Sequence, residues 1–269
     1  MRIVIDVGNT NVTFGLVRGG GISSVFVLNQ EKIKDGLFFK KCLSAYAKKH
    51  RFRLKDIYEI VICSVVPRLD KSLVSRLKKI FPNAAIFRLG KEISIPIKNR
   101  YRFSSQVGKD RLANAVGARF CYKLPAIIVD FGTAITIDIV SAKSEYLGGV
   151  IVPGIKLSLS ALHKNTALLP LITSGIPKNI IGKDTRNSML SGIFYGYAFL
   201  VDGFIAAFKK KLKGRCIVIA TGGNLKLMKS LCKSIDLYDS RITLKGIERT
   251  YIIAKNKGMM LKKSKYSQK

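Results

Sequence analysis

The fold of this chain is decided by a short segment near its start, Ile3-Val4-Ile5-Asp6-Val7-Gly8-Asn9-Thr10. A similar segment occurs near the middle of the chain, Ile127-Ile128-Val129-Asp130-Phe131-Gly132-Thr133-Ala134. Each copy contains an apolar run, an aspartate, a glycine and a polar turn, and a second apolar run follows, so each predicts a β-hairpin. One Asp-x-Gly turn arises easily by chance, but two with matching flanks indicate two related domains.

The segments around the two hairpins alternate between strand and helix patterns. The hairpins are expected over residues 2–17 and 126–140, and further strands over 57–64, 84–89, 146–152 and 216–220. Helices are expected over 37–51, 69–81, 111–122, 155–165, 187–213 and 246–261, followed by a basic tail over 262–269. This alternation predicts an α/β fold in both halves. We place the boundary in the 111–122 helix, which gives domains of residues 1–117 and 118–269.

The chain is strongly basic, with 48 Lys and Arg against 16 Asp and Glu and a formal net charge of +32. Such a charge is typical of proteins that bind nucleic acid or an anionic membrane surface. Here the basic residues are scattered along the whole chain and lysine outnumbers arginine, whereas specific nucleic-acid readers favour clustered arginine forks. The composition therefore favours a solvated basic surface and predicts no specific nucleic-acid partner.

The five cysteines argue against a zinc site or a disulfide framework, because no two have CxxC spacing and both histidines lie far from them. A reducing compartment fits this pattern better. We also expect no signal peptide, because a strand pattern begins at Ile3 without a charged and apolar leader before it.

Residues 188–208 form a long apolar segment that could be mistaken for a membrane span. Asp202 near its middle would cost about 2.5–3.5 kcal/mol on insertion, and Gly192, Gly196 and Gly203 lower its hydrophobicity. We therefore expect a buried helix and no membrane partner. Gly192 and Gly196 are four residues apart on one helical face, which lets another helix approach closely and predicts a dimer interface.

The two repeated turns have the chemistry of an anion site. Gly8 and Gly132 allow phosphate oxygens close to the backbone, and Asp6 and Asp130 end apolar strands, where each carboxylate needs a cation, a metal or a donor nearby. A third glycine turn, Gly222-Gly223, also follows a strand. The alternative is that all three are ordinary turns.

A second group of polar residues, Gly108-Lys109-Asp110-Arg111, precedes a predicted helix. Arg111 can pair with a substrate carboxylate as a bidentate fork. Asp110 lies near the positive helix end, which keeps it ionised and able to accept a proton. The alternative is that Asp110 only caps the helix and Arg111 points to solvent.

Together these segments resemble the type III pantothenate kinases, in that family's order and spacing. The matching segments are Asp6–Asn11, Gly108–Arg111, Asp130–Thr133, Gly148–Gly154 and Thr221–Gly223. The resemblance implies the acetate kinase, sugar kinase and actin superfamily, with two tandem ribonuclease-H-like domains and the active site in the cleft between them. It implies ATP-dependent phosphorylation of pantothenate, the first step of coenzyme A synthesis, in a cytoplasmic homodimer.

The resemblance also implies a role for each matching residue. The first phosphate loop, which binds ATP with Mg²⁺, is matched by Asp6, Val7, Gly8, Asn9, Thr10, Asn11, Val12 and Thr13. Asp110 matches the proton acceptor, Thr133 an ATP contact, and Asp130 the ligand of a monovalent cation, K⁺ or NH₄⁺. Substrate contacts are matched by Tyr101, Gly108, Lys109, Asp110, Arg111 and Thr185.

The chain departs from the family pattern after Tyr101, where Arg102-Phe103-Ser104 replaces the common Asp-Asn-Pro, and at Lys109, where a small residue is common. Both departures concern the substrate pocket. Two alternatives therefore remain open: a related kinase with a different small acceptor, and a basic nucleic-acid-binding regulatory protein on the same scaffold.

Overall fold

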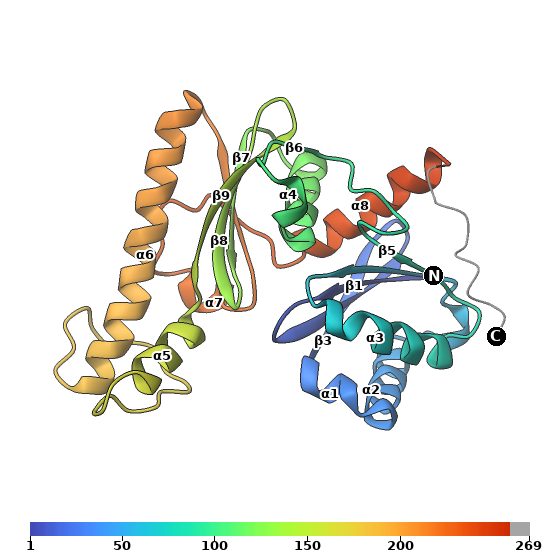
Figure 1. Ribbon diagram of the computed structural model, residues 1–269, viewed down its shortest axis with the longest axis horizontal. Helices are drawn as coiled ribbons and strands as arrows, with labels where there is room; N and C mark the ends of the chain where they lie inside the picture. Colours follow the sequence, from blue (N-terminus) through green and yellow to red (C-terminus); the bar gives the residue numbers. More distant parts are fainter. Residues whose placement is uncertain (259–269) are drawn as a thin grey trace. The chain divides into compact units, whose positions relative to one another are not determined.

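The computed structural model describes residues 1–258 and divides the chain into two compact units. Unit 1 comprises Met1–Ile97, Phe103–Phe120 and the chain from Arg241 onward; unit 2 comprises Lys98–Arg102 and Cys121–Ser240 (Figure 1). This division differs from the two continuous domains predicted from the sequence, because the chain returns to unit 1 after residue 240.

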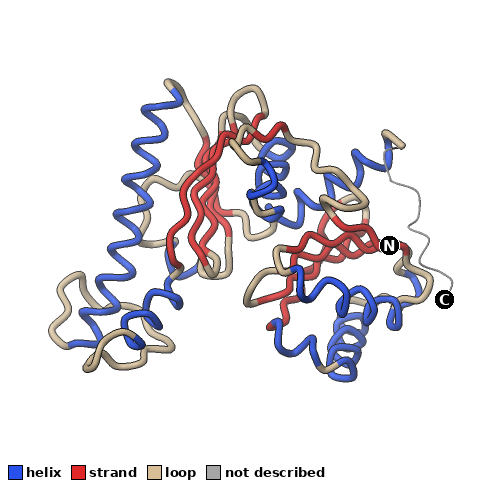
Figure 2. Tube along the Cα trace, viewed as in Figure 1, coloured by secondary structure: helices blue, strands red, loops and turns tan. Residues whose placement is uncertain are grey.

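Unit 1 is built on a five-stranded sheet of order β3-β2-β1-β4-β5. Its strands are β1 (Arg2–Val7), β2 (Asn11–Arg18), β3 (Gly21–Asn29), β4 (Glu59–Ser64) and β5 (Ala85–Arg88) (Figure 2). The first three form an antiparallel meander, and β4 pairs parallel with β1 and β5 with β4. The predicted first hairpin is confirmed. Strand β3 was not predicted from the sequence.

Helices cover both faces of this sheet. They are α1 (Gln30–Lys34), α2 (Gly36–Lys49), α3 (Pro67–Ile80), α4 (Lys109–Cys121) and α8 (Ile242–Asn256). Successive side chains of a strand point to opposite faces of the sheet. On one face, Ile3 and Ile5 pack in a cluster with residues of α2 and α3 such as Leu43 and Leu77. Val4 faces the other way, in a cluster with residues of α4 and α8. Burial on both faces explains the unbroken apolar runs of β1 and β4.

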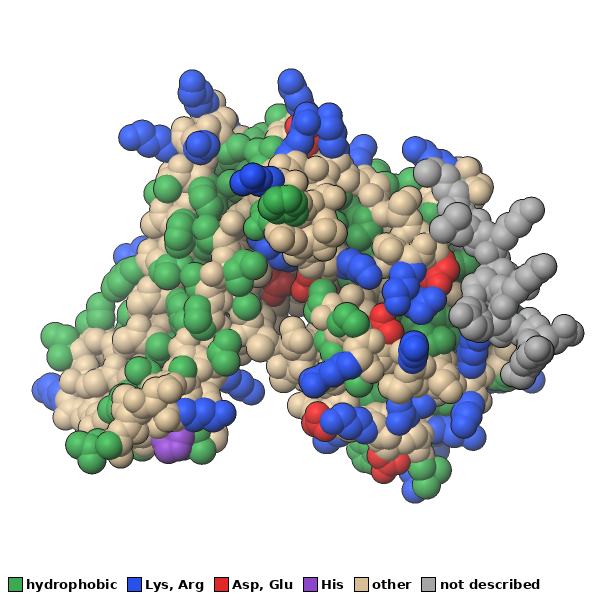
Figure 3. Space-filling model, in the orientation of Figure 1, with side chains coloured by type: hydrophobic (Ala, Val, Ile, Leu, Met, Phe, Trp, Pro, Cys, Tyr) green, Lys and Arg blue, Asp and Glu red, His purple; other side chains and the backbone are tan. Residues whose placement is uncertain are grey.

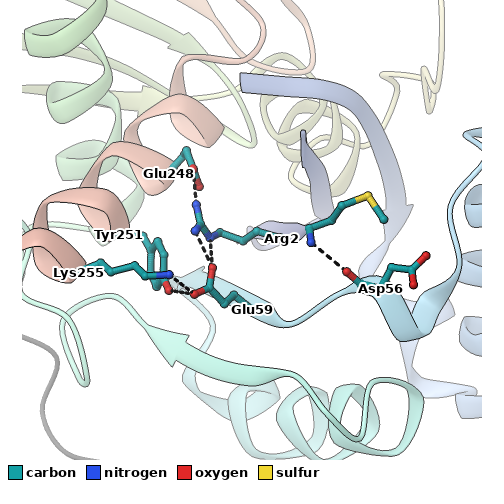
Figure 4. Close-up of polar contacts among 7 residues, drawn as sticks. Arg2, Asp56, Glu59, Glu248, Tyr251 and Lys255 are labelled. Atoms are coloured by element: carbon teal, nitrogen blue, oxygen red, sulfur yellow. Dashed lines mark hydrogen bonds and ion pairs between the residues drawn. The ribbon is translucent and has the colours of Figure 1, made fainter. Parts of the chain in front are cut away.

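Helix α8 is fastened to the sheet of unit 1 by charge as well as by apolar packing (Figure 4). Arg2 on β1 pairs with Glu248 of α8, and its Nη2 lies 2.6 Å from Oε2 of Glu59 on β4. Lys255 of α8 places Nζ 2.6 Å from Oε1 of Glu59. Burial would raise the pKa of Glu59, but hydrogen bonds from Lys255, Tyr251 and Arg2 outweigh it and lower the pKa to about 2.

Helices α4 and α8 also touch through glycines. A Cβ atom at Gly246 would lie 1.8 Å from the carbonyl oxygen of Ala113, and one at Gly117 would lie 2.4 Å from that of Ile242. This close contact is the physical reason why the last helix belongs with unit 1. Helix α8 begins four residues earlier than the helix predicted over 246–261. Residues 259–261 of that prediction, and the predicted tail, lie outside the described residues.

Unit 2 repeats the strand plan of unit 1, in the sheet order β11-β10-β7-β8-β9-β6. Its strands are β6 (Lys98–Asn99), β7 (Ala126–Phe131), β8 (Ala134–Val140), β9 (Glu145–Pro153), β10 (Ile217–Thr221) and β11 (Leu237–Tyr238). Strands β7, β8 and β9 form an antiparallel meander, and β10 pairs parallel with β7. The equivalent places of β1 and β7 confirm that the sequence repeat marks a structural repeat.

The helices of unit 2 are α5 (Ile155–Lys164), α6 (Thr185–Leu212) and α7 (Leu225–Met228). Among the described residues, α6 is the one helix long and apolar enough to cross a membrane. Its residues Phe194, Ala198 and Val201 are nevertheless buried in the core with β7 and β10, and the carboxylate of Asp202 accepts backbone N–H groups of Lys233 and Ser234. Helix α6 is therefore a packed helix of unit 2, as the sequence predicted.

Candidate active site

The first glycine turn joins β1 to β2 in unit 1. Asp6 is paired in the sheet with Thr13 of β2 and with Cys63 of β4. The turn closes where the N–H of Gly8 donates to the carbonyl of Asn11 at 3.0 Å. Asn9, Thr10 and Asn11 are exposed, whereas Val7 and Val12 are fully buried. The segment Asp6–Thr13 therefore presents polar groups to solvent on a rigid apolar base.

The second turn joins β7 to β8 in unit 2, and two other glycines enclose it. Gly222 has φ +102°, and a Cβ atom there would lie 2.6 Å from Oδ1 of Asp130. The N–H of Gly154 donates to the carbonyl of Thr133 at 2.9 Å, and a Cβ atom at Gly154 would lie 2.3 Å from that oxygen. A side chain at either place would clash with the turn, so glycine is needed for these two segments to pack closely against it.

Asp110 lies in the first turn of α4, which begins at Lys109. Its Oδ1 accepts the backbone N–H of Arg111 at 2.8 Å, and a Cβ atom at Gly108 would lie 2.4 Å from the same oxygen. Arg111 is only 6% exposed. The alternative in which Arg111 points to solvent is therefore wrong, and Asp110 lies inside the helix rather than at its N-cap.

Asp6 and Asp110 lie close to the same buried residue, Cys63 at the end of β4. Burial raises the pKa of the Cys63 thiol well above its usual value, and the charges of Asp6 and Asp110 raise it further. The ideal Cβ position of Gly108 is also only 3.7 Å from Cγ1 of Val65, two residues beyond Cys63. Unit 1 thus brings the first phosphate turn and the Asp110 motif to the carboxyl ends of β1 and β4.

The side chain of Lys109 lies against a different segment from those that Gly108 and Asp110 contact. A Cβ atom at Gly90, where φ is +74°, would lie 2.8 Å from Cε of Lys109. The lysine side chain therefore lies across the loop after β5. The absence of a side chain at Gly90 leaves space for this part of Lys109.

Tyr101 and Thr185 both belong to unit 2, but at different ends of it. Tyr101 follows β6, which pairs with the first residues of β9. Thr185 begins α6 beyond α5, and α5 follows the last residues of β9 (Figure 1). Asp184 caps α6 by accepting the N–H of Asn187 at 2.8 Å. Within one chain, the structure does not bring these two predicted substrate contacts together.

The described residues contain no group of three or more His, Cys, Asp or Glu side chains that could hold a metal ion by themselves. A metal here would need additional oxygen ligands, which a bound nucleotide supplies through its phosphates. The single carboxylates of Asp6 and Asp130, each beside an open glycine turn, fit that kind of shared coordination.

Comparison with known proteins places the chain among kinases of one family. A family model described as type III pantothenate kinase matches residues 2–207. The chain is 39% identical over 251 residues to a type III pantothenate kinase of Halalkalibacterium halodurans, covering 93% of this chain and 98% of the relative. It is 38% identical, with the same coverage, to a type III pantothenate kinase of Syntrophus aciditrophicus.

Solved structures agree on the fold. A Baf family transcriptional activator from Campylobacter jejuni aligns with a TM-score of 0.60 and 20% identity, over 94% of this chain and 99% of that one. An activator of 2-hydroxyisocaproyl-CoA dehydratase from Clostridium difficile, solved with bound ADPNP, aligns with a TM-score of 0.54 and 11% identity over 98% of both chains. At these identities the likeness concerns the fold alone.

Proposed function

The chain belongs to the type III pantothenate kinase family, and from this premise we propose how its residues share the reaction. The protein is an ATP-dependent kinase that phosphorylates pantothenate in coenzyme A biosynthesis. The reaction transfers the γ-phosphoryl group to the primary hydroxyl of pantothenate. An O–P bond forms there, the bond to the leaving ADP breaks, and the hydroxyl proton must go to a base.

Asp110 is the proposed base. Two observations support this proposal. Asp110 lies in the first turn of α4 beside Gly108, and its charge acts on the thiol of Cys63, the strand partner of Asp6. A positioned general base typically contributes a factor of about 10²–10⁴ to the rate. Asp6 lies in the sheet at the phosphate turn, which suits it to the Mg²⁺-bound nucleotide rather than to the acceptor hydroxyl.

Backbone groups of each of the two repeated turns are proposed to bind ATP. Asp6–Thr13 would hold the phosphates and Mg²⁺, and Thr133 would contact the nucleotide from unit 2. Mg²⁺ supplies charge neutralisation on the phosphates when it is bound. Asp130, enclosed by Gly222, would hold K⁺ or NH₄⁺. The glycines at 8, 132, 154 and 222 support this assignment, because they keep both turns free of side chains.

Pantothenate is proposed to contact Tyr101, Gly108, Lys109 and Arg111. Thr185 is proposed as a further contact, and its distance from Tyr101 within unit 2 means that it would act on the substrate of a second copy of the chain. The proposed location of the reaction is the cytoplasm, where the family's metabolic substrates occur.

A homodimer is proposed to form through α5 and α6. A Cβ atom at Gly192 or Gly196 would meet no atom of the described residues within 4 Å, so none of residues 1–258 packs against these two positions. Phe199, one helical turn after Gly196, is 62% exposed, and Leu157 of α5 and Ile181 before α6 are also exposed. A cavity of 380 Å³ between α5 and α6 is lined almost entirely by apolar surface. An apolar face of this kind suits a second copy of the same surface.

The Asp110→Asn variant tests the proposed base. Asparagine keeps the size and the hydrogen-bond acceptor but cannot take the proton, so kcat should fall by about 10²–10⁴-fold while ATP affinity changes little. Asp35→Asn is the matched control, because Asp35 caps α2 by accepting N–H groups of Leu37 and Phe38 far from the motif residues in sequence, and asparagine also caps helices well. Nearly full turnover in the Asp110 variant would show that the carboxylate is only a helix-start residue.

A further inference from the structure

Tyr101 is held by unit 2 although the chain on both sides of residues 98–102 belongs to unit 1. Strand β6 pairs with β9 so that Asn99 lies opposite Tyr146, and the N–H of Arg100 donates to the carbonyl of Tyr146 at 2.9 Å. Glu145 pairs with Arg100 at 2.7 Å. The side chain of Asn99 then accepts the N–H of Tyr101 at 2.9 Å. The backbone of Tyr101 is therefore fixed on the edge of the sheet.

The ring of Tyr101 rests on two residues of β9. Gly148 has φ +118°, and its ideal Cβ position lies 3.5 Å from both Cδ2 and Cε2 of Tyr101. The ring of Tyr146 lies with its centroid 6.5 Å from that of Tyr101, at an interplanar angle of 44°. Tilted aromatic pairs at this distance attract each other. The orientation of the Tyr101 ring thus depends on the shape of this part of β9.

Tyr146 is itself held in place by a residue of the neighbouring strand β8. Its side chain is fully buried, and its hydroxyl donates to Oδ1 of Asp138 on β8 at 2.8 Å. Asp138 is also fully buried, and its Oδ2 accepts the hydroxyl of Thr136 at 3.1 Å. A Cβ atom at Gly149 would lie 2.8 Å from Oδ1 of Asp138, so glycine leaves the space that this hydrogen bond occupies.

We propose that Tyr146 and Gly148 are positioning residues that set the direction in which Tyr101 meets pantothenate. Neither residue has a role in the phosphoryl transfer described above. The inference rests on the proposed contact between Tyr101 and pantothenate. A contact to a part of the substrate that does not react is the same in the ground state and the transition state, so its loss raises KM and leaves kcat nearly unchanged.

The test compares Tyr146→Phe and Gly148→Ala with the parent enzyme in steady-state kinetics. Tyr146→Phe keeps the ring and removes the bond to Asp138, and Gly148→Ala places a methyl group beside the Tyr101 ring on a backbone that disfavours it. Each change should raise the KM for pantothenate about three- to tenfold. For Tyr146→Phe this is the range of one lost hydrogen bond. The KM for ATP and kcat should stay within about twofold. Tyr238→Phe is the matched control, because its hydroxyl donates to Lys229 at 3.1 Å on the opposite edge of the same sheet.

Combining each change with Tyr101→Ala separates the two proposals. If the residues act through Tyr101, the three- to tenfold effects should vanish when Tyr101 is already absent. An unchanged KM for pantothenate in Tyr101→Ala alone would overturn the substrate contact itself. Two results would overturn only the positioning roles, provided that Tyr101→Ala itself raises the KM for pantothenate. In the first, Tyr146→Phe and Gly148→Ala leave this KM unchanged. In the second, they raise it by the same factor whether residue 101 is Tyr or Ala. If Tyr146→Phe fails to fold, the Gly148→Ala cycle decides alone.

Discussion

At the scale of single residues, Asp130 is a carboxylate at the end of β7 that backbone of neighbouring segments closely surrounds. It lies opposite Thr136 and Thr221 in the sheet. Gly222 approaches it so closely that a single methyl group would meet Oδ1 at 2.6 Å. If the adjacent turn binds phosphates as proposed, their negative charge beside this carboxylate favours a bound cation.

We expect turnover to depend on a monovalent cation at Asp130. Replacing K⁺ by Na⁺ should lower kcat, because the smaller ion fits a site formed for K⁺ less well, and Asp130→Asn should flatten the response to K⁺ concentration. Steady-state rates in matched chloride salts measure both effects. Equal rates of the parent enzyme in the two salts would remove the assigned role of Asp130.

The residues of the candidate site were predictable where a local pattern identifies them. Asp6, Asp130 and Asp110 each lie two residues from a glycine, at the end of a strand or the start of a helix, and the structure has them in those places. Tyr146 and Asp138 were not predicted, because their importance depends on β6 pairing with β9 across more than forty residues of sequence. The one local signal, a buried aspartate in the alternating strand β8, does not reveal its partner.

At the scale of elements, the predicted hairpins and helices are confirmed and the exceptions have physical causes. Strand β3 follows a two-residue turn, Gly19-Gly20, with φ of +60° and +79°. It is an edge strand in which Ser23 and Ser24 interrupt the apolar residues, so that only the four-residue run Val25–Leu28 remains. Helix α8 was assigned to the second domain because it comes last, whereas Arg2, Glu59 and the α4 contact hold it in unit 1.

The ion pairs of Glu59 with Arg2 and Lys255, which hold α8 on the sheet, predict that Glu59→Gln lowers stability in a pH-dependent way. The folded pKa of Glu59 is lowered from 4.5 to about 2, so its stabilising effect is present above pH 4.5 and is lost as the pH falls towards 2. At pH 7 the variant should lose about 1–3 kcal/mol of unfolding free energy, the value of charged hydrogen bonds. The difference from the parent should shrink steadily between pH 4.5 and pH 2. Chemical denaturation across this range measures it.

Glu31→Gln is the control for this series. Its ion pair with Lys34 is 2.6 Å long but both side chains are largely exposed. Such surface pairs contribute less than about 1 kcal/mol. An equal effect of the two substitutions at pH 7 would contradict the role given to the Glu59 cluster.

The open face of α6 predicts that Gly196→Leu weakens the dimer without harming the fold. A Cβ atom at this position meets none of the described residues within 4 Å, and leucine favours helix over glycine by up to about 1 kcal/mol. In a close helix contact between copies, the added bulk should raise the dissociation constant about tenfold or more. Sedimentation equilibrium measures this, with Gly21→Leu in unit 1 as a control at another open glycine. An unchanged dissociation constant would exclude this face from the interface.

At the scale of the whole molecule, the charge of +32 is spread rather than gathered. On the face shown in Figure 3, Lys and Arg side chains lie over many elements of both units. A dispersed field of this kind attracts polyanions weakly and is screened by salt. The charge therefore does not compete with the kinase assignment, which rests on the family match and on carboxylates that a binder of anions would not require.

The departures at Lys109 and after Tyr101 make the identity of the acceptor the most direct test of the whole account. The measurement is phosphoryl transfer from ATP by the purified protein, with pantothenate and a panel of other small hydroxy acids, and with the phosphorylated product identified by mass spectrometry. The Asp110→Asn variant serves as the blank for contaminating kinases.

We predict ADP formation that requires pantothenate, a product heavier than pantothenate by one phosphoryl group, and the highest kcat/KM of the panel for this acceptor. The signal should fall by about 10²–10⁴-fold in the Asp110→Asn blank. Transfer to another hydroxy acid with none to pantothenate, or equal transfer by the parent protein and the blank, would contradict the account.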